Sequence, residues 1–369
     1  MKICITVGAR PNFMKVAPLI HAIEKAKNAG QDIDSSLIYA GSENDPTLED
    51  SLFSDMMINR PDVYLGVDCQ NLNELTGRVM SEFDRYLTEN KTDVVIVVDD
   101  LASTMAAAIV TKKHGIALAH LVAGTRSFDI KMPKEINRLV IDGLSDFLFT
   151  AGIGSNSIVN REGAELSHVY EVGNILIDTL RFNHKRLSRP HVFDQLCIKE
   201  GEYIVFTLNR KALIEKEENL KVQLLLRRDM KFLDDIQLQM STAREFMFAY
   251  RITVERLADG MHNIHIIDPL PYLKFGYLTA HAKGIVTDSG NVAEEATFNN
   301  VPCVTLNNYT EHIETVKVGS NILVGEDAEK LAECVTDIEE GRWKKSSLPD
   351  RWDGRTSERI VHILQEAKL

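Results

Sequence analysis

The stretch that decides the fold is KICITVGARPNFMKVAP, residues 2–18 of the chain. Residues 3–7 are mostly apolar and β-branched, which predicts a buried strand, and Gly8-Ala9-Arg10-Pro11 predicts a tight turn after it. Residues 13–27 then have the apolar spacing of a helix. A strand, a glycine-containing turn and a helix in this order are typical of α/β proteins with parallel sheets.

The same alternation of strand and helix runs along the whole chain. Helices are expected at residues 73–87 and 104–114, and strands at residues 36–39, 93–98, 117–122 and 146–150. A second set of strands is expected at residues 203–207, 245–248, 264–267, 284–287 and 303–306. Because these runs are continuously apolar, helices should cover both faces of each sheet. We therefore expect an α/β protein with two Rossmann-like domains facing a cleft, joined by a linker within residues 182–197.

Length, composition and charge agree with two such domains and argue against several classes of partner. Of the 369 residues, 44% are hydrophobic and 26% are charged, as in ordinary globular enzymes. The formal net charge of −12 would repel nucleic acids and anionic membranes. No apolar run approaches the roughly 20 residues of a membrane span, and the first apolar run is too short for a signal peptide.

The five cysteines indicate a reducing compartment. They are scattered along the chain without a Cys-x-x-Cys pair, so they predict no disulfide framework. Cys4 and Cys303 lie in apolar strand-like runs and are expected to be buried. We expect a cytoplasmic protein.

The first loop, Gly8 to Pro11, has the composition of an anion site. Glycine permits the tight turn, and the start of the following helix favours a negative charge. Arg10 can bind a phosphate through two hydrogen bonds, and Lys15 adds a charge one turn later. The alternative is an ordinary strand–helix turn that carries surface cations.

A second loop of this kind is Thr287-Asp288-Ser289-Gly290-Asn291, followed by Glu294-Glu295. Free backbone amides and a serine hydroxyl suit a pyrophosphate, and a carboxylate one turn later can accept hydrogen bonds from both ribose hydroxyls. The alternative is a helix that is merely capped by Ser289 or Asp288.

Two further segments follow expected strands and should point toward the same cleft. They are Asp99-Asp100 and Ala123-Gly124-Thr125-Arg126. Adjacent carboxylates can hold one proton between them and do acid–base work. They can equally bind a cation or cap the helix that starts near Ser103.

Taken together, these segments resemble the non-hydrolysing UDP-N-acetylglucosamine 2-epimerases over nearly the whole chain. The matching motifs are GARPNFMKVAP (8–18), AGTRSFDIKMPKEINR (123–138), VGNILIDTL (172–180), DPLPYLKF (268–275), TDSGNVAEEA (287–296) and RWDGRTSERIV (351–361). The resemblance implies the GT-B fold, with an N-terminal Rossmann-like domain at 1–178 and a UDP-binding domain at 199–350. It also implies a C-terminal helix at 351–369 that returns to the first domain, and a homodimer.

The resemblance assigns roles to particular residues. Those that match UDP-binding residues of the family are Arg10, Arg210, Phe275, Ser289, Gly290 and Glu295. Those that match residues important for catalysis are Asp100, Glu135 and Lys15. The family needs no nicotinamide cofactor, and the first loop lacks the G-x-G-x-x-G spacing of one. No group of His, Cys and Asp has the spacing of metal ligands, so neither a cofactor nor a metal is expected.

Several positions depart from the family pattern. The replaced family residues stand at Val122, Lys134, Asn209, Arg251 and His312, where the family has carboxylates, histidines or an arginine. The resemblance implies that the protein binds UDP or acts on a UDP-N-acetylhexosamine, interconverting UDP-GlcNAc and UDP-ManNAc by elimination and re-addition of UDP. The replacements leave two alternatives open: a UDP-sugar-binding paralogue without activity, and a UDP-sugar hydrolase or transferase on the same fold.

Overall fold

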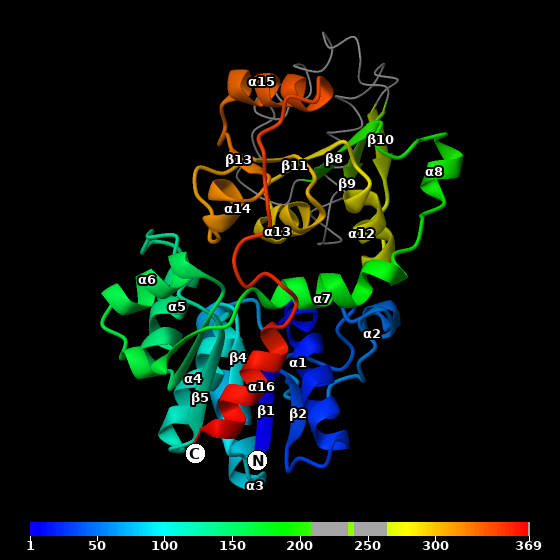
Figure 1. Ribbon diagram of the computed structural model, residues 1–369. Coiled ribbons are helices and arrows are strands. Elements are labelled where there is room, and N and C mark those ends of the chain that lie inside the picture. The colour runs from blue at the N-terminus through cyan, green and yellow to red at the C-terminus, as the bar shows by residue number, and fades with distance from the viewer. Residues whose placement is uncertain (208–234, 240–263, 368–369) are drawn as a thin grey trace. The chain divides into compact units, whose positions relative to one another are not determined.

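The computed structural model describes residues 1–207, 235–239 and 264–367 (Figure 1). The chain divides into two compact units, the first made of Met1–His184 with Asp350–Leu369 and the second of Lys185–Pro349. Each unit is built on its own parallel sheet. The expected α/β architecture with two Rossmann-like domains is confirmed.

The first unit contains a seven-stranded sheet in the order β3-β2-β1-β4-β5-β6-β7. Its strands are β1 Lys2–Val7, β2 Asp34–Tyr39, β3 Val63–Tyr64, β4 Val94–Val98, β5 Ala117–Ala123, β6 Phe147–Thr150 and β7 Val169–Glu171. All residues of the central strand β4 are fully buried, because helices cover both faces of the sheet. These helices are α1 Arg10–Asn28, α2 Asp50–Met56, α3 Leu72–Glu89, α4 Ala102–Lys113, α5 Pro133–Leu144, α6 Ile153–Arg161, α7 Ile175–Asn183 and α16 Thr356–Glu366.

Aspartates placed just before strands hold the amino edge of this sheet together. Asp93, which precedes β4, accepts a hydrogen bond from the backbone amide of Lys2 at 2.7 Å. Asp146, which precedes β6, accepts one from the amide of Leu118 at 2.8 Å. Each carboxylate thus satisfies an amide of the neighbouring strand at the point where the ladder begins.

The second unit contains a six-stranded parallel sheet in the order β10-β9-β8-β11-β12-β13. Its strands are β8 Tyr203–Thr207, β9 Asp235–Gln239, β10 Ile264–Ile267, β11 Gly284–Thr287, β12 Cys303–Thr305 and β13 Asn321–Leu323. Its described helices are α8 Val192–Gln195, α12 Tyr272–Ala280, α13 Gly290–Asn299, α14 Glu314–Lys317 and α15 Ala328–Glu339. Cys303 in β12 is fully buried, as is Cys4 in the first sheet, which confirms both as core residues.

The C-terminal helix α16 belongs to the first unit, although the entire second unit precedes it in the sequence. Asp178 of α7 accepts hydrogen bonds from the amides of Thr356 and Ser357, at 3.1 and 2.8 Å, and from the Ser357 hydroxyl at 2.7 Å. Trp352, just before the helix, is 1% exposed and donates to the Ala151 carbonyl at 3.3 Å. In Figure 1 α16 (red) lies beside α1 (blue).

Most of the strands and helices predicted from the sequence are present within a few residues of the expected bounds. The strands that the sequence did not predict are β3, β7, β9 and β13, three of which have only two or three residues. The strand expected at 245–248 lies outside the described residues. No helix in the described parts of the chain is long and apolar enough to span a membrane.

Candidate functional site

The loop after β1 brings an arginine to the carboxyl edge of the first sheet, where ligands bind in folds of this kind. A side chain at Gly8 would put its Cβ 2.0 Å from Oγ of Ser103, so the position requires glycine. The Asn12 side chain accepts hydrogen bonds from the amides of Gly8 and Ala9 at 3.0 and 3.1 Å. Arg10 begins α1, and its guanidinium makes no hydrogen bond or ion pair with any described residue. It is available to an anionic ligand.

Lys15, in contrast, is not the surface cation that the alternative interpretation of this loop expects. The residue is 9% exposed, and its Nζ donates to Oδ1 of Asp99 at 2.5 Å. The other oxygen of Asp99 accepts a hydrogen bond from Nδ2 of Asn12 at 2.8 Å. Asp99 therefore balances the charge of Lys15 and joins α1 to the end of β4.

Asp100 faces a different pair of cations. Its Oδ2 accepts hydrogen bonds from Nε and Nη2 of Arg138 at 2.8 and 2.6 Å, and its Oδ1 lies 3.3 Å from Nζ of Lys134. Burial acts to raise the pKa of Asp100, but the charges of Lys134 and Arg138 outweigh it and the pKa lies below the ordinary value. Of the alternatives left open for this pair, the contacts favour cation binding, because Asp99 pairs with Lys15 and Asp100 pairs with Lys134 and Arg138. Neither carboxylate caps α4.

Glu135 lies in the first turn of α5, where both of its oxygens hold the preceding loop. Oε2 accepts hydrogen bonds from the amide and hydroxyl of Ser127, both at 2.9 Å, and from Nη1 of Arg138 at 3.2 Å. Oε1 accepts one from the amide of Phe128 at 3.0 Å. Burial opposes ionisation, but these hydrogen bonds and the charge of Arg138 place the pKa of Glu135 below its ordinary value. Arg138 thus bridges Glu135 and Asp100.

Two neighbouring residues at the same edge have strained backbones. Asp99 follows β4 with φ of 58°, and Val122 lies near the end of β5 with φ of 74°. They occupy adjacent positions, since Val98 pairs with Leu121 and the register of β5 shifts between Leu121 and Ala123. Positive φ is uncommon for aspartate and an outlier for a β-branched residue such as valine. Strain of this kind accumulates at functional sites.

A buried network behind this edge keeps the strained residues in place. Nε2 of His120 donates to the carbonyl of Asp99 at 3.0 Å, and Nδ1 shares a hydrogen bond with Oδ1 of Asp142 at 2.5 Å. Arg126 pairs with Oδ2 of Asp142 at 2.7 Å and with Glu162 at 2.5 Å. Arg126 is therefore a structural cation and does not point toward a ligand, contrary to the expectation for segment 123–126. Burial opposes ionisation of Asp142, but His120 and Arg126 lower its pKa.

The second unit presents an open helix start at the loop between β11 and α13. Ser289 occupies the N-cap position of α13 but makes no capping hydrogen bond through its side chain, contrary to the capping alternative for Ser289. Within the described part of the chain, the amides of Gly290, Asn291 and Val292 donate to no acceptor. A Cβ at Gly290 would meet open space. Such a helix start can bind a phosphate.

One turn further along α13, Glu295 is a buried carboxylate that lacks a donor. The residue is 6% exposed, and it has neither a hydrogen bond nor an ion pair among the described residues. Burial, together with the charge of Glu294, raises the pKa of Glu295 to about 8. Glu294 itself lies 3.6 Å from Nε2 of His312. Buried polar groups in proteins are almost always hydrogen-bonded, so Glu295 is suited to donors supplied by a ligand.

The other residues predicted for the UDP site are described only in part. Phe275 lies in α12, half-buried against the core of the second unit. Arg210, Asn209 and Arg251 lie outside the described residues. In those parts of the chain that the structure does describe, no cluster of three or more His, Cys, Asp and Glu side chains could hold a metal ion.

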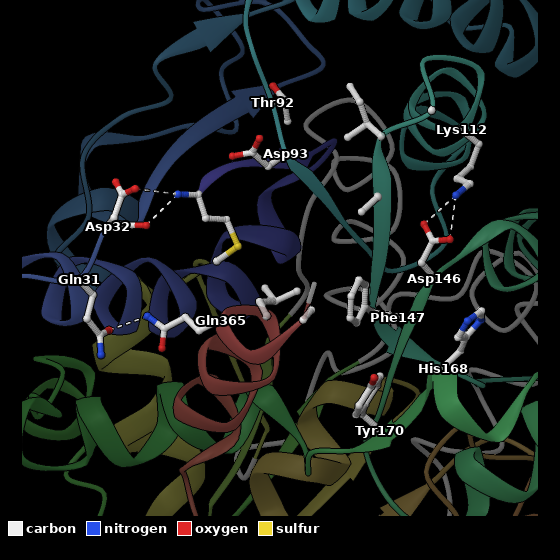
Figure 2. A pocket seen from close by; sticks show the side chains of 16 residues that line it. Gln31, Asp32, Thr92, Asp93, Lys112, Asp146, Phe147, His168, Tyr170 and Gln365 are labelled. Carbon is white, nitrogen blue, oxygen red and sulfur yellow. Dashed lines mark hydrogen bonds and ion pairs between the residues drawn. The ribbon is translucent and has the colours of Figure 1, made fainter. Parts of the chain in front are cut away.

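Two cavities of the first unit lie at opposite edges of its sheet. One, of 430 Å³, lies at the carboxyl edge and is lined by Gly8, Ser103 and the loop around Gly41. The other, of 1190 Å³, lies at the amino edge (Figure 2). In its lining Lys112 pairs with Asp146, and the amino group of Met1 pairs with Asp32. The cavity at the carboxyl edge lies beside the loop of Arg10, at the edge where ligands bind in folds of this kind.

Comparison with known proteins identifies the family. The family model described as UDP-N-acetylglucosamine 2-epimerase matches residues 25–365. A UDP-N-acetylglucosamine 2-epimerase of Methanocaldococcus jannaschii is 33% identical, and the match covers 100% of both chains. The chain belongs to the UDP-N-acetylglucosamine 2-epimerase family.

Other members of the family extend the comparison. The crystal structure of the M. jannaschii epimerase in complex with UDP-GlcNAc and UDP matches with a TM-score of 0.84 and 32% identity over 100% of both chains. The UDP-2,3-diacetamido-2,3-dideoxy-D-glucuronate 2-epimerase of Pseudomonas aeruginosa is 31% identical over 90% of this chain and 91% of its own. The fold is GT-B, as the resemblance implied.

Against the family pattern, the structure shows what the replaced positions do in this chain. Val122 keeps a strained backbone without a carboxylate. Lys134 contributes a cation to Asp100, and His312 faces Glu294. The sequence did not indicate the partners of these residues. It indicated Asp99 as part of a carboxylate pair at this edge, but not its pairing with Lys15, and it indicated no role for His120. The only sequence signal for Asp99 was its position directly after an apolar strand.

Proposed function

We propose that this protein binds a UDP-N-acetylhexosamine and interconverts its two C2 epimers. The observation that carries the proposal is the carboxylate of Glu295, buried and without a donor, one turn after the open amides of α13. Two ribose hydroxyls would satisfy Glu295, and the diphosphate would accept hydrogen bonds from the amides of Gly290 and its neighbours. In the first unit, Arg10 is an uncompensated cation among the described residues and is available to an anionic ligand.

The chemistry must remove a hydrogen that no carbonyl activates. A base takes the proton from C2, the electron pair of that bond forms the C1=C2 double bond, and the C1–O bond breaks so that UDP leaves with its electrons. UDP then attacks C1 again, and C2 receives a proton on the opposite face. The reaction therefore requires a base, an acid on the other face and stabilisation of the departing diphosphate.

Among the residues predicted for catalysis, Asp100 is the one best placed to act as the base. Its lowered pKa keeps it ionised at neutral pH, and among the described residues its Oδ1 contacts Lys134 alone, at 3.3 Å. Both oxygens of Glu135, in contrast, are occupied by the loop at Ser127 and Phe128. We assign Glu135 to positioning Arg138 and this loop. Lys15, paired with Asp99, is a positioning residue for the first loop.

A second function, UDP-sugar binding without epimerisation, is favoured by the same ion pairs. Asp100 is held by two cations, and at Val122, where the family has a carboxylate, no proton can be transferred. Each acid or base contributes about two to four orders of magnitude to the rate, so these changes would leave binding intact while slowing turnover strongly.

The two functions are separated by a proton and phosphorus NMR time course with UDP-N-acetylglucosamine in deuterated water. An epimerase incorporates deuterium at C2 and accumulates the manno epimer, and Asp100→Asn should abolish both while UDP binding persists. Asp84→Asn, an exposed change of equal charge on α3, should leave both unchanged. Line broadening of the nucleotide without deuterium uptake would instead establish the binding function. Absence of any nucleotide binding would overturn both.

We further infer that the protein is a cytoplasmic homodimer. All five cysteines are free, which agrees with a reducing compartment. Four large apolar side chains of α5 and the loop before it are exposed, namely Phe128, Ile130, Ile136 and Leu139. A patch of this kind supports an interface between copies. Light scattering coupled to size-exclusion chromatography tests the dimer, and Ile136→Glu should yield monomers if this face forms the contact.

A further inference from the structure

A network of hydrogen bonds joins the first loop and the start of α1 to the carboxylate of Asp99 at the end of β4. Its Oδ1 accepts a hydrogen bond from Nζ of Lys15 at 2.5 Å, and its Oδ2 accepts one from Nδ2 of Asn12 at 2.8 Å. Asn12 in turn accepts from the amides of Gly8 and Ala9. The carboxylate of Asp99 and the side-chain oxygen of Asn12 thus accept the hydrogen bonds that an oxyanion ligand would otherwise accept in a loop of this type.

The position of Asp99 in this network is fixed, and its side chain is still partly exposed to solvent. His120 donates to the carbonyl of Asp99 and keeps its backbone at a φ of 58°. The Asp99 side chain is 17% exposed, and that of Lys15 is 11% exposed. The ion pair of Lys15 and Asp99 is therefore partly exposed at the carboxyl edge of the sheet, where a ligand would approach.

We propose that Asp99 is a specificity-determining residue that favours UDP-sugars over free UDP. The inference rests on the proposed function, since it takes the loop of Arg10 as a phosphate-binding loop. Lys15 and Asp99 cancel each other, so the loop offers a ligand only the net charge of Arg10. In a UDP-sugar the outer phosphate is a diester, whereas in free UDP it is a monoester with more negative charge. By lowering the net positive charge of the loop, Asp99 disfavours free UDP more than a UDP-sugar.

The test compares the affinities of UDP and UDP-N-acetylglucosamine for full-length variants by isothermal titration calorimetry. In Asp99→Asn the charge is removed, and asparagine tolerates positive φ, so the fold should persist. We expect affinity for UDP to rise about three- to tenfold more than affinity for UDP-N-acetylglucosamine. The gain should shrink at high ionic strength, because the effect is electrostatic.

Three further variants make the result decisive. Asp99→Gly, which also fits the backbone angle, should reproduce the shift in the ratio of affinities. Lys15→Met combined with Asp99→Asn should return the ratio to that of the wild type. Asp84→Asn controls for net charge and should not change it. An unchanged ratio in folded Asp99→Asn and Asp99→Gly, with both ligands bound, would overturn this inference alone. If neither ligand bound the wild type, the proposed function would fall with it.

Discussion

Lys134 and Asp100 form an ion pair in which Nζ lies 3.3 Å from Oδ1, while Arg138 holds the other oxygen. In the family pattern a carboxylate stands at the position of Lys134 and would repel Asp100. Here the cation of Lys134 lowers the pKa of Asp100, the carboxylate proposed as base. The charge of Lys134 therefore sets the pH range in which Asp100 can accept a proton.

Lys134→Met should move the acidic limb of the pH–activity profile to higher pH. Removal of the cation raises the pKa of Asp100, so a higher pH is needed to ionise the base. The measurement is kcat/KM for UDP-N-acetylglucosamine as a function of pH. Lys131→Met, an exposed change of the same charge three residues earlier, is the control. Identical profiles for all three proteins would show that Asp100 is not the base.

Glu295 should make UDP binding depend on pH in the neutral to alkaline range. The pKa is about 8 in the free protein, and hydrogen bonds from ribose hydroxyls favour the charged form, so the pKa falls on binding. Affinity should rise with pH up to about 8 and then level off, with release of a proton. Calorimetry in buffers of different ionisation enthalpy measures that proton. Glu295→Gln should abolish the release, and proton uptake by the wild type would contradict the prediction.

Asp142→Asn should destabilise the protein by about 3 kcal/mol, because it leaves the buried Arg126 without part of its compensating charge. The pKa of Asp142 is lowered in the folded state, so its contribution is complete at neutral pH and is lost as pH falls below the ordinary value of 3.8. Urea unfolding at pH 7 measures the loss. Asp84→Asn, whose carboxylate is exposed and pairs with His114, should cost less than about 0.5 kcal/mol.

Asp178→Ala should release the C-terminal helix from the first unit. The carboxylate accepts hydrogen bonds from the amides of Thr356 and Ser357 and from the hydroxyl of Ser357, and in the variant these donors would lose their acceptor. We expect a loss of about 2 kcal/mol in the free energy of unfolding and faster proteolysis before α16. Ser357→Ala removes one of these bonds and should cost about 1 kcal/mol or less. Equal protease resistance in wild type and Asp178→Ala would count against this anchoring.

The fold was largely predictable from the sequence, because its strands are buried on both faces. The run at Val94–Val98 is apolar at every position, and such a run is typical of a strand that is buried on both faces of a parallel sheet. Strands of two or three residues, such as β3 at Val63–Tyr64, carry too little pattern to be recognised. They are held by neighbours that the sequence does not reveal.

The site was predictable only as a set of residues, without their partners. The loops at Arg10 and Ser289 follow apolar strands, and that position indicated them. The pairing of Lys15 with Asp99 joins residues 84 positions apart, so spacing alone cannot predict it. Nor can a sequence show that Val122 adopts a positive φ, since valine is among the residues least expected to do so.

The return of α16 to the first unit also sets the order in which the protein can be completed on the ribosome. Translation proceeds at about 5–20 residues per second, and domains usually fold in the order in which they emerge. Here residues 185–349 are made between the sheet of the first unit and its last helix. The nascent first unit must therefore wait with the docking surface of α16 uncovered, and the second unit is the first to have its whole sequence outside the ribosome.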